Sequence, residues 1–362
     1  EPGELRVERF FAELAESRLA AELQITNSSD PPHVKLSISD MSVYLPGIID
    51  LLTLEGREAA GAVRPRIFDD SDFDLSGLAS FDMALSATGE VIGIDSPIFD
   101  SLKLGMDLTQ GHLLLNHFLG TTTKGKFSLK GDWNVAGAGA PEMAMDLDVD
   151  RISLGSLLHR TEIADWLRDA PMSGTVKGHL KGMSPADLAA SFTGQVNLSV
   201  GPGEIDQSVI DWLGGDLIST IYNTMNPFAK TTPYSQLLCA EARLPFVDGV
   251  SQFEKKMALE TKRVALMASG RIDLGQENID LSLASTPKEG FGPTLGGSLI
   301  RLKGRLDDPN VSLDAWGASK KAISVGTSIL TGGVSSLLEA IFDRISKETN
   351  LCQVVSGTPV SQ

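Results

Sequence analysis

The feature that most constrains the fold is the alternation of apolar and polar residues between residues 264 and 314. Apolar side chains stand at every second position, as at Ile279, Leu281 and Leu283. A period of two places alternate side chains on one face of a β-strand and the intervening ones on the other. Residues 275–278 form a link short enough to join two such strands as a hairpin. This region is predicted to form an antiparallel sheet with one apolar and one polar face.

The same alternation recurs along most of the chain. Residues 34–45 and residues 145–157 both change parity midway, as a strand does at a β-bulge, where one residue is inserted. The matching positions of the two segments indicate a weak internal repeat. Residues 4–25 are ambiguous, since helix propensity is high there. The alternation favours a hairpin that turns near Ala15, and we predict the hairpin.

Helices are expected to be few. Residues 161–168 are one short candidate, and another begins at Ser184, because serine is a good N-cap and Pro185 suits the first turn. A longer helix is predicted within residues 205–223 and a closing helix within residues 316–348, since apolar residues recur there at helical spacing. The closing helix is expected to cover the end of the sheet, with transient docking at a bilayer as the alternative.

These patterns predict a mainly β fold with a few helices: an elongated, curved antiparallel sheet, shaped as a half-pipe or repeating β-groove and capped by helices. Glycine is frequent, at 36 residues, and aromatic residues make up only 6%, which favours short strands and turns. The predicted organisation is a first β module, a second β module with inserted helices, a C-terminal sheet, the closing helix and a disordered tail. Their bounds are residues 1–66, 67–235, 236–315, 316–348 and 349–362.

The charge balance limits the partners of the chain. Its formal net charge is −16, so neither nucleic-acid binding nor flat adsorption to an anionic membrane is expected. The sequence contains no apolar run of the length that a bilayer span needs, and no leader precedes residue 1. We therefore expect a mature or trimmed chain from which any anchor has been removed.

Motifs for chemistry are not evident. The five histidines lack metal-ligand spacing, and there is no phosphate loop, nucleophile elbow or HExxH motif. Carboxylates alternate with apolar residues, as at Asp146, Asp148 and Asp150, which is typical of a solvated face. We predict a protein that is not an enzyme and has no cofactor and no metal site. The two cysteines, Cys239 and Cys352, are either buried thiols or one long-range bridge in an oxidising compartment.

Three segments carry a family resemblance. Residues 173–194 are SGTVKGHLKGMSPADLAASFTG, residues 238–250 are LCAEARLPFVDGV, and residues 269–314 contain a G-x-I-D-L pattern followed by G-x-L-x-x-P-x-V. In order and spacing they resemble the large C-terminal region of the AsmA family of Gram-negative envelope proteins. Leu244 stands where that family usually has phenylalanine. Fainter similarity extends through residues 68–160.

The resemblance implies a periplasmic protein that is tethered to the inner membrane of a Gram-negative bacterium by an N-terminal helix missing from this chain. It also implies the β-groove architecture that the family shares with TamB-like and bridge-like lipid transfer proteins. A role in phospholipid transport and outer-membrane biogenesis follows from the same resemblance.

The leading hypothesis is a non-enzymatic lipid-binding or lipid-transfer module that shields a phospholipid, or another acyl lipid, in an apolar groove. Each acyl CH2 buried contributes about 0.8 kcal/mol, so no specific polar site is required. The predicted lining residues are Leu36, Ile38, Met143, Met145, Leu147, Val149, Val196, Leu198, Leu281, Leu283 and Leu302.

The alternative hypothesis is a scaffold or chaperone for outer-membrane protein assembly. Its partner would be an envelope protein whose strands it binds by β-augmentation. We also predict a disulfide between Cys239 and Cys352 that attaches the final helix to the C-terminal sheet.

Overall fold

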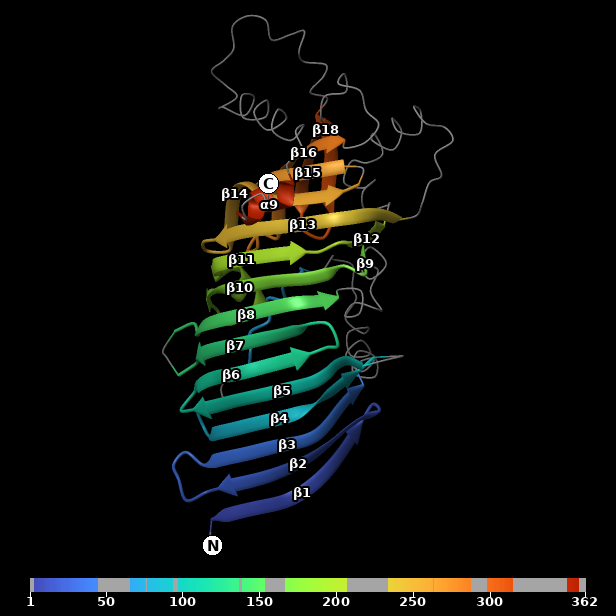
Figure 1. The fold of residues 1–362 in the computed structure, drawn as a ribbon. Helices are drawn as coiled ribbons and strands as arrows, with labels where there is room; N and C mark the ends of the chain where they lie inside the picture. Colours follow the sequence, from blue (N-terminus) through green and yellow to red (C-terminus); the bar gives the residue numbers. More distant parts are fainter. Residues whose placement is uncertain are drawn as a thin grey trace, which may run out of the picture. The chain divides into compact units, whose positions relative to one another are not determined.

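A computed structural model gives the fold of the chain. The fold is mainly β, as predicted. The structure describes residues 3–44, 66–75, 77–93, 97–136, 139–153, 167–206, 234–262, 264–287, 298–314 and 350–357. Within these residues, 18 strands belong to one mostly antiparallel sheet that does not close on itself, and two short helices are present (Figure 1).

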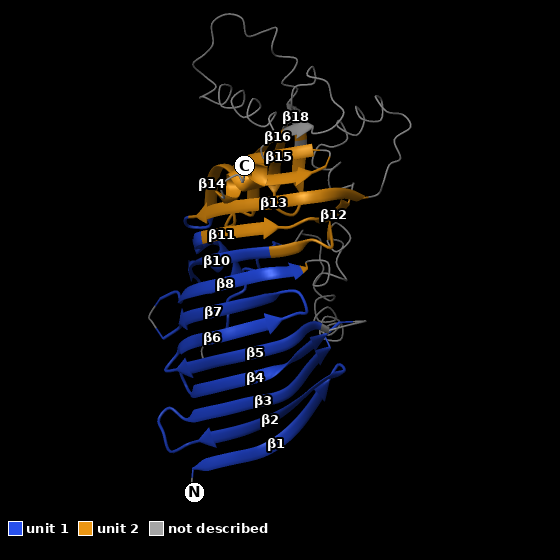
Figure 2. Cartoon of the chain, in the orientation of Figure 1, with its two compact units in different colours: residues 1–152, 173–194, 247–249 blue, residues 153–172, 195–246, 250–362 orange. Residues whose placement is uncertain are grey.

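The chain divides into two compact units (Figure 2). Unit 1 comprises residues 1–152, 173–194 and 247–249, and unit 2 comprises residues 153–172, 195–246 and 250–362. This division lies elsewhere than the predicted module boundaries, since the boundary after residue 66 falls inside unit 1 and the boundary after residue 235 falls inside unit 2.

Unit 1 holds the first eight strands and most of β10. Its strands are β1 (Glu4–Leu14), β2 (Ser17–Thr26), β3 (His33–Tyr44), β4 (Asp82–Ile92), β5 (Pro97–Thr109), β6 (His112–Thr121), β7 (Lys126–Asn134), β8 (Glu142–Ser153) and β10 (Pro171–Lys181). Strands β1 to β8 pair in chain order, and every pair is antiparallel except β3–β4. A parallel pair needs a long connection, which residues 45–81 provide.

The predicted hairpin at the start of the chain is confirmed. Strands β1 and β2 join through Ala15 and Glu16, whose φ angles of 48° and 64° are those of a tight hairpin turn. The predicted bulges are also present, because Asp40 in β3 and Arg151 in β8 have φ angles of 53° and 52°. Asp40 and Arg151 have the same spacing as the starts of the two repeated segments, residues 34 and 145. The internal repeat therefore includes the backbone conformation at the bulge.

Unit 2 holds the remaining strands. They are β9 (Leu167–Arg168), β11 (Thr193–Val200), β12 (Gly203–Asp206), β13 (Tyr234–Phe246), β14 (Val250–Thr261), β15 (Val264–Asp273), β16 (Asn278–Pro287), β17 (Ser298–Arg305) and β18 (Pro309–Asp314). Antiparallel pairs run in chain order from β12 to β18. The predicted hairpin at residues 275–278 is confirmed, since β15 and β16 pair up to Asp273 and Asn278.

Of the two described helices, α4 was predicted and α9 was not. Helix α4 (Pro185–Ser191) begins as expected, with Ser184 Oγ accepting the N–H of Asp187 at 3.1 Å. Helix α9 (Leu351–Ser356) lies in the segment that was expected to be a disordered tail, so that expectation is wrong for these residues. Asn350 caps the N-terminus of α9 and Gly357, with φ of 73°, ends it.

The other predicted helices fall mostly outside the described residues. Leu167 and Arg168, at the end of one candidate, form β9, and Ile205 and Asp206, at the start of another, belong to β12. The rest of both candidates and the closing helix at residues 316–348 lie outside the described part of the chain. In that part, no helix has the length and apolar character needed to cross a membrane.

Candidate functional site

The strand register of unit 1 aligns apolar side chains in rows that cross the sheet. The central row runs from β1 to β8 through Val7, Leu23, Leu36, Leu85, Met106, Leu115, Gly131 and Met145. One flanking row consists of Leu5, Ile25, Val34, Met83, Leu108, Leu113, Trp133 and Met143. The other consists of Phe10, Ala21, Ile38, Ala87, Leu104, Phe118, Leu129 and Leu147. Because cross-strand partners point to the same side, these three rows form one surface, the apolar face of unit 1.

Most side chains of the apolar face are half-buried. In the central row, for example, Leu36, Met106 and Met145 are neither enclosed in a core nor fully exposed. A few members, such as Leu108 at 1% exposure, are enclosed. Apolar area left in contact with water costs about 25 cal/mol per Å². The apolar face therefore retains area that an apolar ligand would remove from water.

The opposite face of the same strands is polar. Asp107, which follows Met106 in β5, accepts a hydrogen bond from Asn116 at 2.6 Å. Asp146, which follows Met145 in β8, forms an ion pair with Lys177 at 2.9 Å. Ion pairs of this exposed kind contribute little to stability, but they mark the solvated side of the sheet.

A segment outside the sheet lies against one edge of the apolar face. Residues 66–75, which we call the strap, are held by two backbone hydrogen bonds near α4, from Phe73 N to Met183 O at 2.7 Å and from Ala186 N to Asp69 O at 2.9 Å. The Phe73 ring meets the indole of Trp133 edge to face, with 5.7 Å between ring centroids. The strap therefore contacts the row that contains Trp133.

An aromatic cluster borders the apolar face beyond its other flanking row. Phe127 packs edge to face on both Phe99 and Phe118, with 5.1 Å between ring centroids in each pair. Its ring lies over Gly120, where an added Cβ would come within 2.1 Å of it. The absence of a side chain at Gly120 thus leaves room for the Phe127 ring at this border of the apolar face.

The predicted lining residues of unit 1 are all half-buried, and five of them belong to the apolar face: Leu36, Ile38, Met143, Met145 and Leu147. Val149 pairs with Phe127 and lies beyond the flanking row, beside the aromatic cluster. The contact of these residues with lipid stays a prediction. Sequence reasoning missed the members contributed by β1, β2 and β4 to β7, among them Leu85, Met106 and Leu115. These strands also alternate, but Leu113, Leu114 and Leu115 are consecutive leucines. The sequence alone therefore does not show which of them lie on the apolar face, because that depends on strand register.

The predicted lining residues of unit 2 have different surroundings. Leu281, Leu283 and Leu302 are 4%, 7% and 5% exposed, and Leu281 pairs directly with Leu302. Val196 and Leu198 are half-buried, and Leu198 packs against the buried cluster around Leu237 and Val264. Leu281, Leu283 and Leu302 are thus already enclosed, and Leu198 packs on a buried cluster. We therefore take the continuous, half-buried rows of unit 1 as the candidate site.

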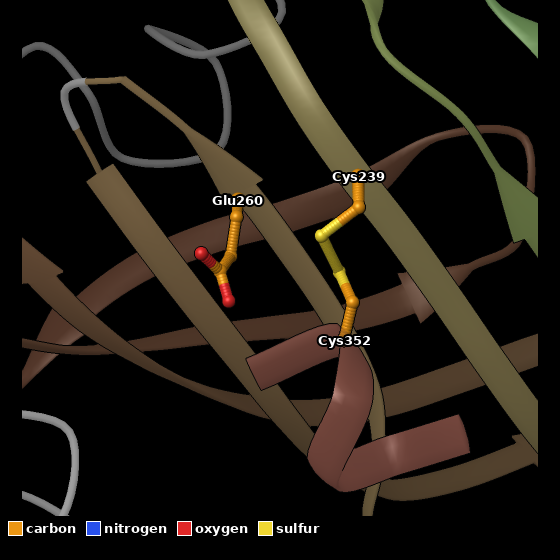
Figure 3. A group of neighbouring side chains, drawn as sticks. All are labelled: Cys239, Glu260 and Cys352. Atoms are coloured by element: carbon orange, nitrogen blue, oxygen red, sulfur yellow. A yellow bond between two sulfur atoms is a disulfide. The ribbon is translucent and has the colours of Figure 1, made fainter. Parts of the chain in front are cut away.

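The predicted disulfide between Cys239 and Cys352 is confirmed, with an S–S distance of 2.00 Å and a Cα–Cα distance of 6.4 Å. It joins β13 to α9 (Figure 3). The attached helix is therefore α9, whereas the final helix of the prediction lies outside the described residues. The N–H of Leu351, the first residue of α9, donates to the buried carboxylate of Glu260.

Helix α9 lies on the face of the sheet that does not carry Leu266. Leu351 and Cys352 pack with Ala258, Ala265 and Met267, whereas Leu266 packs in the cluster around Leu237. Neighbouring residues of a strand point to opposite faces. The face of β15 that includes Leu266 is consequently not the seat of α9.

Potential metal ligands meet at the same place. Cys239, Glu260 and Cys352 bring one ligand atom each to within 4.8 Å of one another, which is the one such group among the described residues. The thiolate is the form of cysteine that binds metals, and both sulfur atoms are bonded to each other here. The group is therefore a structural anchor for α9.

Models of protein families, curated proteins and solved structures were compared with this chain. None matches. The resemblance of residues 173–194, 238–250 and 269–314 to the AsmA family stays a prediction, and a proposal for function rests on the geometry of the apolar face.

Proposed function

We propose that the protein is a non-enzymatic lipid-binding module that shields phospholipid acyl chains on the apolar face of unit 1. The observation that carries the proposal is the continuity of the three apolar rows across eight strands while most of their side chains remain half-buried. Each CH2 that a ligand buries there contributes about 0.8 kcal/mol. Passive shielding of this kind needs no catalytic group.

The length of a row suits an acyl chain. Adjacent strands lie about 4.8 Å apart, so the row from β1 to β8 measures roughly 34 Å across the strands. The hydrocarbon core of a bilayer, which holds two acyl chains end to end, is about 30 Å thick. One chain laid along a row would thus be covered over its whole length.

The wider setting is also part of the proposal. We place the protein in the periplasm of a Gram-negative bacterium, tethered to the inner membrane, where an elongated, curved half-pipe would carry lipid for outer-membrane homeostasis. The disulfide between Cys239 and Cys352 gives weak support, because such bonds persist in oxidising compartments. The AsmA resemblance supports the same setting.

Two neighbouring residues of β8 offer a matched test. Met145 lies on the apolar face and Ala144 on the opposite face, and both are half-buried. We expect gently purified protein to carry phospholipid that mass spectrometry detects. Met145→Glu should lose most of it, since a carboxylate is costly to bury in an apolar contact, and Ala144→Glu should retain it.

Circular dichroism of both variants controls for folding. If wild-type protein carries no phospholipid and acquires none from liposomes, the proposal fails. Equal retention by the two folded variants would place any bound lipid away from the apolar face.

A second candidate function has one observation in its favour. Strand β1 lies at the end of the strand series of unit 1 (Figure 1) and exposes Leu5, Phe11 and Leu14 to 57%, 73% and 64%. Such a strand is suited to pairing with a client strand of an outer-membrane protein. A photo-crosslinker at Met106 should capture lipid under the first proposal, whereas one at Phe11 should capture polypeptide under the second.

A further inference from the structure

The apolar face of unit 1 includes a buried polar atom, the indole Nε1 of Trp133. Among the residues that the structure describes, none is a hydrogen-bond partner for this nitrogen. Indole nitrogen is a donor only, and a buried donor without an acceptor is unfavourable. Most buried polar groups are paired. An unpaired donor at a candidate ligand surface therefore suggests that a ligand supplies its acceptor.

The surroundings of Trp133 explain why its N–H is unpaired. Its cross-strand partners are Leu113 on β6 and Met143 on β8. The strap adds the ring of Phe73, which meets the indole edge to face. The leucine and phenylalanine side chains contain no acceptor, and the methionine thioether is a weak one. The described neighbours therefore offer the N–H no good acceptor, and a bound ligand could supply one.

The chemistry of the site limits which acceptor fits. A pure hydrocarbon has none, and a carboxylate or phosphate would bring a charge into an apolar surface at high cost. A neutral carbonyl attached to an acyl chain meets both requirements. We propose that Trp133 is a specificity-determining residue that donates its indole N–H to the ester carbonyl of a diacyl lipid, an inference that rests on the proposed lipid binding.

The position of Trp133 fits this role. It belongs to a flanking row, so an acyl chain that lies along the central row with its ester end at β7 would place that ester beside the indole. In the protein alone the Phe73 ring contacts the indole edge to face. The carbonyl would displace the Phe73 ring and leave the backbone hydrogen bonds of the strap, such as that of Phe73 N, in place.

The test compares a soluble short-chain diacyl phosphatidylcholine with its dialkyl ether analogue, which has the same chains without carbonyls. Wild-type protein is expected to bind the ester about five-fold more tightly, the effect of one neutral hydrogen bond. Trp133→Phe removes the N–H and keeps an aromatic ring. It should bind both lipids with the affinity that wild-type protein has for the ether.

A spectroscopic measurement covers the case in which Trp133→Phe folds poorly. With ¹⁵N-labelled tryptophan, the Trp133 indole resonance is assigned as the one that remains when Trp166, Trp212 and Trp316 are each replaced by phenylalanine. It should move downfield when the ester lipid is added to wild-type protein and stay in place with the ether. Equal affinity of wild-type protein for ester and ether, or an ester preference that survives in Trp133→Phe, would overturn the role of Trp133 and leave lipid binding intact. Failure of both lipids to bind would overturn both proposals.

Discussion

Polar side chains in this sheet hold the backbone where a strand leaves its regular path. Lys255, with φ of 54°, lies at a register shift in β14, and its N–H donates to Ser269 Oγ at 2.9 Å. Arg151, at the bulge in β8, donates its N–H to Ser173 Oγ at 3.0 Å. In both cases a serine of another strand supplies an acceptor at the irregular residue. Ser269 and Ser173 thus stabilise the irregular backbone at Lys255 and Arg151.

The turn after β15 makes a prediction at the same scale. Burial acts to raise the pKa of Asp273, but the N–H of Gln276 and the guanidinium of Arg271 outweigh it and hold the pKa below its ordinary value of 3.8. The unfolded chain then binds more protons at low pH. The stabilisation is present above pH 3.8 and is lost as the pH falls through the folded-state pKa.

We expect Asp273→Asn to lower the free energy of unfolding by about 1 kcal/mol at pH 7 and to reduce its dependence on pH below 4. Urea denaturation at pH 7 and pH 3 measures both. Asp280→Asn is the control, because Asp280 forms a largely exposed ion pair with Lys303 at 3.4 Å, and such pairs contribute little. An unchanged pH dependence in Asp273→Asn would contradict the assignment.

At the scale of the element, local signals were predictable and register was not. The turn at Ala15, the parity change at Asp40 and the cap at Ser184 each depend on a few adjacent residues. The parallel pair of β3 and β4 depends instead on a long connection, which alternation does not encode. The apolar face follows from register, so some of its members in β3 and β8 were predicted, whereas those of β1, β2 and β4 to β7 were missed.

Helix α9 was missed for a related reason. It is six residues long, too short for a helical period or for stability in isolation. Its contacts come from distant residues: the disulfide to Cys239, the carboxylate of Glu260, and the packing of Leu351 against Met267 and its neighbours. The pairing of the two cysteines was predicted, but the helix it attaches was not.

The disulfide makes the prediction at this scale. Its cysteines are separated by 113 residues, and replacing both by serine should lower the free energy of unfolding by about 2 to 5 kcal/mol. We also expect α9 to leave β13 and β14, which limited proteolysis near Leu351 would detect. Glu260→Gln keeps an acceptor for the Leu351 N–H and should leave α9 protected. Equal protease resistance with and without the disulfide would show that packing alone holds α9.

At the scale of the whole molecule, the same sequence pattern has two outcomes. Alternation places Leu36 in unit 1 and Leu283 in unit 2 on apolar faces, yet Leu36 is half-buried and Leu283 is 7% exposed. Alternation predicts that a face is apolar, whereas burial depends on what packs against it. The proposed ligand site therefore belongs to unit 1.

This difference leads to a prediction about where a ligand acts. A ligand that binds only the folded state stabilises the part of the protein that it contacts. Hydrogen exchange with and without a soluble diacyl phosphatidylcholine should show slower exchange in β4 to β7 and no change in β15 to β17. The same protection in both units would contradict a site restricted to unit 1.

Gly131 supplies the variant for this experiment, because it interrupts the central row between Leu115 and Met145. An added Cβ would meet only ordinary contacts, the nearest being Leu115 Cβ at 3.6 Å. Gly131→Leu should fold normally, occupy the space of an acyl chain and abolish most of the protection in β4 to β7. Ala144→Leu adds a leucine on the opposite face and should preserve it. Undiminished protection in Gly131→Leu would mean that the chain does not lie along the central row.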